Sequence, residues 1–201
     1  MYAILWYRRR HKREYQPIRS VESVSLDDDS TVNLQALDVV RIEANDVVQT
    51  QMVGSGAFAD VWLGSYRGQP VAIEQLHSHG KILTRAQLQS FVDEFVLMSA
   101  FKSPRLVTLI GAAWTRPRML QCVMEWMDQG DLRYYLASHG PNAYTWPDKL
   151  AHIFHIVEGL VYLHSMFVVH RDLKSRNILL DGTHDPNWQT LAYPKPTSNR
   201  P

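Results

Sequence analysis

One short segment, residues 170–180 with the sequence HRDLKSRNILL, constrains this chain more than any other part of it. It places Asp172, Lys174 and Asn177 close together. A carboxylate can orient a hydroxyl group and accept its proton, a cation can stabilise a moving phosphoryl group, and an amide oxygen can bind magnesium. Because the apolar run 178–180 is typical of a strand, we expect these side chains on a loop that leads into a strand. The segment therefore favours phosphoryl-transfer chemistry.

The first half of the chain has the pattern of a β-rich unit. Runs of β-branched and aromatic residues predict strands at 47–53, 60–66, 69–75, 106–114 and 120–125. Gly54 and Gly56 separate the first two runs, which indicates a hairpin. A helix is expected at residues 84–100 with Thr84 as its N-cap. Apolar residues at helical spacing predict that its buried face is formed by Leu88, Phe91, Val92, Phe95 and Met98.

The second half of the chain has a helical pattern, with helices expected at residues 132–138 and 146–166. His152 and His155 lie three apart on the longer helix, and two interpretations are open. They are either a pair of metal ligands or ordinary surface or core histidines. Since structural and catalytic metal sites need at least a third protein ligand, and none is evident, the second interpretation is favoured.

The order of these features is similar to that of the protein kinases. The loop H-R-D-L-x-x-x-N, the glycine-rich turn GSGAFADVWLG and the strand motif V-A-I-x occur in the order found in that family. The string HRDLKSRNILL looks most like the tyrosine-kinase-like group, and Lys174 favours serine/threonine specificity. The resemblance implies an α+β fold, with a complete small lobe of a five-stranded antiparallel sheet plus one helix. It also implies a partial, mostly helical large lobe.

The resemblance also implies roles for individual residues. Asp172 would be the catalytic base, Lys174 the cation beside the phosphate and Asn177 a magnesium ligand, with His170 as a structural anchor. Glu94 would be the helix glutamate that pairs with the strand lysine in the family. ATP and magnesium are the implied cofactors, and the expected nucleotide-binding positions are Val53, Gly54, Gly56, Val61, Ala72, Glu74, Glu125, Met127 and Leu179.

The sequence departs from the family pattern at the strand lysine, where Glu74 stands. In the family, a lysine at this position binds the α- and β-phosphates of ATP and pairs with the helix glutamate. The lysine–glutamate pair of the family has an attraction of about 4 kcal/mol at roughly 4 Å. If Glu74 faces Glu94, two carboxylates meet instead, and the attraction becomes a repulsion of similar size. The third glycine of the phosphate loop is replaced by Ala59, and residues 181–201 contain no D-F-G triplet.

These departures predict a protein kinase domain fragment that is inactive or strongly impaired. The family transfers the γ-phosphoryl group of ATP to serine, threonine or tyrosine hydroxyls of proteins. The alternative is a pseudokinase that acts as a binding module and regulates an intact partner kinase. An early end of the large lobe would leave an apolar face of helix 146–166 uncovered, and this face would bind a partner or aggregate.

Charge and composition limit the partners. The net charge of +1 argues against nucleic acid as a partner, because the phosphate backbone is bound by a concentrated basic face. Cys122 is the only cysteine, so no internal disulfide can form and the chain is expected to be intracellular. The apolar residues 1–7 are followed by basic residues 8–13. This pattern fits either the end of a membrane helix, with attachment at the cytoplasmic face, or a solvated basic terminus.

Three regions are therefore expected. Residues 1–46 would be the basic terminus and a polar linker, and residues 47–182 a partial kinase domain. Residues 183–201, with several prolines and no periodicity, are expected to be disordered.

Overall fold

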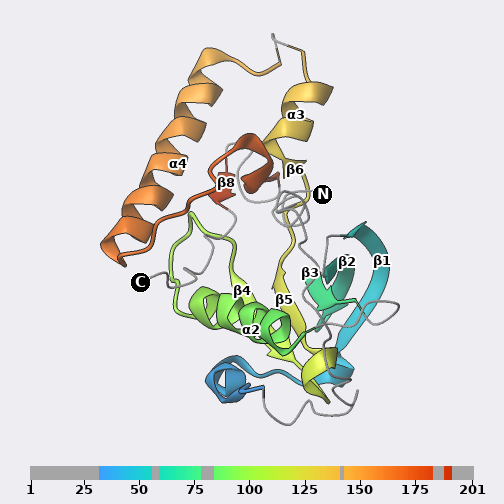
Figure 1. The fold of residues 1–201 in the computed structure, drawn as a ribbon. Helices are drawn as coiled ribbons and strands as arrows, with labels where there is room; N and C mark the ends of the chain where they lie inside the picture. Colours follow the sequence, from blue (N-terminus) through green and yellow to red (C-terminus); the bar gives the residue numbers. More distant parts are fainter. Residues whose placement is uncertain (1–31, 56–58, 78–83, 141–142, 183–187, 192–201) are drawn as a thin grey trace, which may run out of the picture.

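The small lobe is a five-stranded sheet with one long helix beside it. The computed structural model describes residues 32–55, 59–77, 84–140, 143–182 and 188–191. The sheet order is β1-β2-β3-β5-β4, with all neighbours antiparallel. Its strands are β1 (Val47–Ser55), β2 (Ala59–Tyr66), β3 (Gln69–Leu76), β4 (Leu109–Ala113) and β5 (Gln121–Glu125). The predicted fold of this lobe is confirmed (Figure 1).

The turn between β2 and β3 consists of Arg67 and Gly68, both with positive φ, at 50° and 80°. Two-residue turns with positive φ at both positions match the right-handed twist of the strands that they join. They fix the register in which Val61 pairs with Glu74. The pairing of β3 with β5 then sets Glu74 opposite Cys122, in the middle of the sheet.

Helix α2 (Arg85–Ser99) is the one long helix among the described residues of the small lobe. Thr84 and Gln87 form a capping box, in which the Thr84 side chain accepts from the Gln87 amide at 3.2 Å and the Thr84 amide donates to Gln87 Oε1 at 2.8 Å. Such a box satisfies two amides that the first turn would otherwise leave unpaired. The buried side chains of the helix are those predicted, namely Leu88, Phe91, Val92, Phe95 and Met98.

The chain before β1 is more ordered than the predicted polar linker. Two 3₁₀ turns, η2 (Gln35–Val40) and η3 (Ala44–Asp46), precede the sheet. Leu37 in η2 is fully buried in the same apolar cluster as the inner face of α2. The folded unit therefore begins before residue 47, because an apolar residue of this segment completes the small-lobe core.

The described part of the large lobe contains two helices and a small sheet. Its elements are β6 (Gly130–Asp131), α3 (Leu132–Ser138), α4 (Trp146–Ser165), η5 (Ser175–Asn177), β7 (Ile178–Asp181) and β8 (Trp188–Leu191). The sheet order is β6-β7-β8. Strand β8 differs from the expectation of disorder after residue 182, because its backbone pairs with β7 from Ile178↔Leu191 to Asp181↔Trp188. The rest of that expected tail lies outside the described residues.

Helix α4 stands at the outer edge of the molecule (Figure 1). Thr145 and Asp148 form its capping box, and Leu163 anchors its inner side in a second apolar cluster with Leu106 and Ile178. Its other side exposes large apolar residues, as the sequence predicted: Trp146, Leu150, Ile153, Phe154, Val157 and Val161. No helix in the described ranges is both long and apolar enough to cross a bilayer.

Candidate functional site

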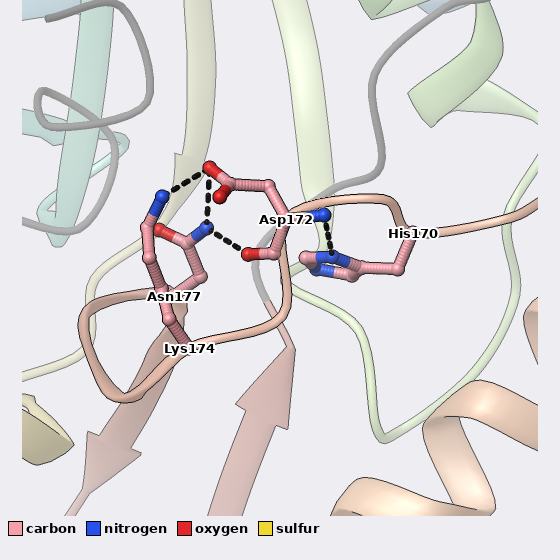
Figure 2. Close-up of polar contacts among 4 residues, drawn as sticks. All are labelled: His170, Asp172, Lys174 and Asn177. Carbon is pink, nitrogen blue, oxygen red and sulfur yellow. Dashed lines mark hydrogen bonds and ion pairs between the residues drawn. The ribbon is translucent and has the colours of Figure 1, made fainter. Parts of the chain in front are cut away.

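The loop between α4 and β7 brings the three predicted catalytic side chains together (Figure 2). The Lys174 ammonium group forms an ion pair with Asp172 Oδ2. Asn177 Nδ2 donates to the Asp172 carbonyl oxygen at 2.7 Å and to Asp172 Oδ2 at 3.3 Å. The aspartate is thus held by a cation and an amide, and its side chain is still 29% exposed, so it stays accessible to a hydroxyl group.

Local backbone geometry fixes this loop. His170 is buried, its carbonyl oxygen accepts from the Asp172 amide at 2.8 Å, and its Nδ1 lies 3.4 Å from the same amide. Arg171, between them, has a φ of 62°, which an L-residue adopts only at some cost. Such positions persist where their surroundings hold them, as the buried His170 does here. The structure is therefore consistent with the predicted anchoring role of His170.

Asn177 has the chemistry of a magnesium ligand. Its residue is buried, and its Oδ1 has no hydrogen-bond partner among the described residues. Buried acceptors are normally satisfied, and an unpaired amide oxygen beside a carboxylate has the chemistry of a divalent-cation ligand. Asn177 would hold magnesium, and the metal would neutralise charge on the transferring phosphoryl group. This side of the predicted site fits the implied cofactor.

The apolar positions among those predicted to bind the nucleotide belong to one cluster. They come from strands β1, β2, β3 and β7 and from the segment after β5, and all are at most 7% exposed. These residues are Val53, Val61, Ala72, Met127 and Leu179. Met124 of β5 lies in the same cluster. The fold thus gathers residues that are far apart in sequence, as a shared binding role requires.

Glu74 is the member of the predicted site that does not fit. Its residue is only 5% exposed, so its carboxylate lies within the small lobe and away from bulk water. A buried carboxylate next to nucleotide phosphates would add repulsion where the family pattern supplies attraction. Glu94 is half-buried on α2. Its pairing with Glu74 remains a prediction.

The remaining predicted positions have different outcomes. Gly54 pairs with Val61 at the end of β1. Gly56 lies outside the described residues. The Glu125 amide donates to the Thr108 carbonyl oxygen at 3.1 Å, and Glu125 Oε1 accepts from the Thr108 amide at 2.7 Å. This double contact fixes the end of β5, from which the chain crosses to the large lobe.

Sequence reasoning missed the contact that ties this crossing to β7. The Gly182 amide donates to Asp128 Oδ1 at 2.7 Å, and the Gln129 amide donates to the Leu180 carbonyl oxygen at 3.1 Å. A Cβ atom at Gly182 would lie 2.6 Å from Gln129 Nε2, so a side chain there would displace Gln129. The Asp-Gly pair at 181–182 was the available signal, since such pairs mark tight turns.

His152 is a core histidine, as favoured over the metal interpretation. Its Nδ1 lies 2.5 Å from the Tyr144 hydroxyl, and the residue is 4% exposed. Burial, with a smaller contribution from nearby His155, lowers the pKa of His152 to about 4. Within the described ranges, no three potential ligands lie close enough to hold a metal ion.

Comparison with known proteins supplies the family. A family model described as protein tyrosine and serine/threonine kinase matches residues 47–186. Tyrosine-protein kinase csk-1 of Caenorhabditis elegans is 35% identical over 162 residues, which cover 81% of this chain and 29% of that protein. Serine/threonine/tyrosine-protein kinase HT1 of Arabidopsis thaliana is 38% identical over 130 residues, covering 63% of this chain and 33% of its own.

Dual specificity protein kinase splA of Dictyostelium discoideum is 34% identical over 150 residues, which cover 73% of this chain and 6% of that protein. The chain spans a third or less of the length of these three relatives. The first of these relatives is named as a tyrosine kinase, the second as a serine/threonine/tyrosine kinase and the third as a dual specificity kinase. The family match covers most of the chain and includes both lobes and the loop with Asp172. The chain therefore belongs to the protein tyrosine and serine/threonine kinase family.

Proposed function

We propose that this chain is a kinase domain whose own phosphoryl transfer is absent or strongly impaired. Its family transfers the γ-phosphoryl group of ATP to protein hydroxyls, and the chain keeps the loop groups for that reaction. The observation that carries the proposal is the buried carboxylate of Glu74 on β3, at the position of the family's strand lysine. Serine or threonine hydroxyls are the substrate class that Lys174 favours, with tyrosine as the further class.

Glutamate in place of lysine at position 74 reverses the sign of the charge on this side chain. A lysine at position 74 would attract the phosphates of ATP, whereas an ionised Glu74 repels them. At roughly 4 Å and an effective dielectric near 20, each interaction is about 4 kcal/mol, so the change from lysine to glutamate spans about 8 kcal/mol before relaxation. Protonation of Glu74 would remove the repulsion but would not restore the attraction. Nucleotide binding is therefore the step that suffers first.

The loop residues still have defined roles if a nucleotide is present. Asp172 would orient the attacking hydroxyl and accept its proton, and Lys174 would stabilise charge on the transferring group. Asn177 would supply one oxygen to magnesium. The family's second magnesium ligand is the aspartate of D-F-G, and residues 182–201 contain no such triplet. Asp185 is the only acidic residue in that range. The ligand set for magnesium thus remains incomplete within this sequence.

A phosphotransfer assay tests the proposal. Purified chain is incubated with magnesium and γ-labelled ATP, with myelin basic protein or a glutamate–tyrosine copolymer as acceptor, and compared with the Asp172→Asn variant. We expect the two proteins to incorporate label at the same background rate. A rate for the unaltered chain that is at least about tenfold above that of Asp172→Asn would refute the impairment.

A second function is a binding module that regulates an intact kinase partner. The apolar residues exposed along α4 favour it, because contiguous exposed apolar surface marks interaction sites. The chain would then act through contact rather than catalysis. Attachment of the chain to the cytoplasmic face of a membrane through residues 8–13 is a further prediction, and these residues lie outside the described ranges.

A further inference from the structure

The segment before the matched kinase region is built into the small lobe. Residues 32–46 precede the family match, which begins at residue 47. They contain η2, which lies against both α2 and β4. In Figure 1 this segment lies beneath α2, on the side away from the large lobe. The helix that carries Glu94 is therefore contacted by a segment that precedes the matched family region in the sequence.

One leucine makes the central contact. Leu37 is fully buried and shares the main apolar cluster with Phe91 and Phe95 of α2. Val32, Leu34 and Val40 are partly buried against the same cluster. Val39, on the same 3₁₀ turn, is 85% exposed. The turn thus presents one side to the core, and α2 has apolar neighbours from η2 as well as from the sheet.

Polar contacts hold both ends of the segment. The Asn33 amide donates to Gln89 Oε1 on α2 at 3.3 Å. The Ile42 amide donates to the Ala112 carbonyl oxygen on β4 at 3.0 Å. A Cβ atom at Gly111 would lie 2.5 Å from Ile42, so the glycine leaves room for the segment to run along β4. The segment is thereby fastened to the helix at one end and to the sheet at the other.

Arg41 adds a contact at the surface. Its guanidinium group lies 4.4 Å from the centre of the Trp114 ring, and its Nη2 donates to the Trp114 carbonyl oxygen at 3.4 Å. A cation over an indole face is worth about 0.5–1 kcal/mol at exposed sites. This contact closes the segment over the end of β4 without entering the core.

We propose that residues 32–46 act as an intramolecular clamp that fixes α2 on the small-lobe sheet, with Leu37 as its positioning residue. Withdrawal of Leu37 would remove apolar contacts from one side of α2 and free the helix that carries Glu94. Through the clamp, a change in the chain N-terminal to the kinase domain would change the position of this helix. This proposal does not depend on nucleotide binding, so its failure and that of the proposed function are separate results.

Amide hydrogen exchange, read by mass spectrometry on the full chain without nucleotide, tests the clamp because it reports local opening. Leu37→Ala is expected to speed exchange across residues 85–99 by at least about tenfold and to leave residues 146–165 within about twofold of the unaltered chain. Val39→Ala, the matched change on the exposed side of η2, should leave both unchanged. Leu37→Met keeps apolar volume and should restore slow exchange in α2.

Two further variants keep the result decisive. Leu163→Ala removes a buried leucine from the large-lobe cluster, and it should speed exchange in α4 more than in α2. Arg41→Ala leaves the core intact and should still raise exchange in α2, which supplies a result if Leu37→Ala does not fold. Equal acceleration of α2 and α4 in Leu37→Ala would show a general loss of stability and overturn the proposal. Unchanged α2 exchange in both Leu37→Ala and Arg41→Ala would overturn it as well.

Discussion

Acidification is expected to destabilise the large lobe through His152. The ring is buried beside Tyr144, with the hydroxyl 2.5 Å from Nδ1 and the ring centres 5.2 Å apart. Its Nε2 is also buried, without a hydrogen-bond partner among the described residues. Burial disfavours the charged ring and lowers its pKa from 6.5 to about 4, with His155 adding to the effect and Asp148 opposing it.

The sign and size follow from linkage. Above pH 6.5 the ring is neutral in both states, and its full contribution to stability is present. Between pH 6.5 and 4 the unfolded chain binds a proton that the folded chain does not, so stability falls as the pH falls. The difference of about 2.5 pH units corresponds to roughly 3 kcal/mol in total, of which about 2 kcal/mol is lost by pH 5.

The assay is urea denaturation at a series of pH values between 7.5 and 5. The unaltered chain is compared with His152→Gln, which cannot titrate, and with His164→Gln at an exposed position of the same helix. The free energy of unfolding of the unaltered chain should fall by about 2 kcal/mol more than that of His152→Gln. His164→Gln should follow the unaltered chain. Identical pH dependence for the unaltered chain and His152→Gln would refute the argument.

Three other predictions are tested by single substitutions. Gly64→Ala should destabilise the chain by about 1–3 kcal/mol in urea denaturation, because the new Cβ would lie 2.3 Å from a backbone oxygen of Val48. Gly140→Ala is the control, because its new Cβ would meet no atom within 4 Å and should not destabilise the chain in this way. Equal midpoints for the two would contradict this. Thr84→Ala removes one half of the α2 capping box and should cost about 1 kcal/mol, and no change would refute the role of the cap. Phe154→Lys places a charge on the exposed face of α4 and should reduce concentration-dependent association in sedimentation velocity, and unchanged association would exclude that face as the cause.

Local periodicity explains what the sequence predicted well. The five buried residues of α2 and its Thr84 cap follow from helical spacing and from side-chain chemistry within one turn. The same holds for α3, whose bounds match the predicted range 132–138. The loop with Asp172 was predicted because its residues are near one another in sequence. The hydrogen bonds between Asn177 and Asp172 are made within the loop itself.

Long-range contacts explain what the sequence did not predict. Leu37 stands among other apolar residues, such as Leu34 and Val40, and the surface offered by α2 and β4 accounts for its complete burial. Strand β8 lies in a segment with several prolines, and it forms because β7 offers an edge with unpaired backbone groups. The sequence predicted Asn177 as a magnesium ligand, but the burial of its Oδ1 without a hydrogen-bond partner among the described residues depends on the surrounding fold.

The most direct test of the account is thermal stabilisation by ATP, with and without magnesium. A ligand that binds the folded state raises its stability, by about 2.7 kcal/mol at a concentration one hundred times its dissociation constant. We predict that millimolar ATP leaves the Tm of the unaltered chain unchanged. Glu74→Lys should show a magnesium-dependent rise in Tm. Glu43→Lys, which makes the same charge change at an exposed position, should show no rise. A clear magnesium-dependent shift of the unaltered chain would show that ATP binds despite Glu74, and would contradict the account.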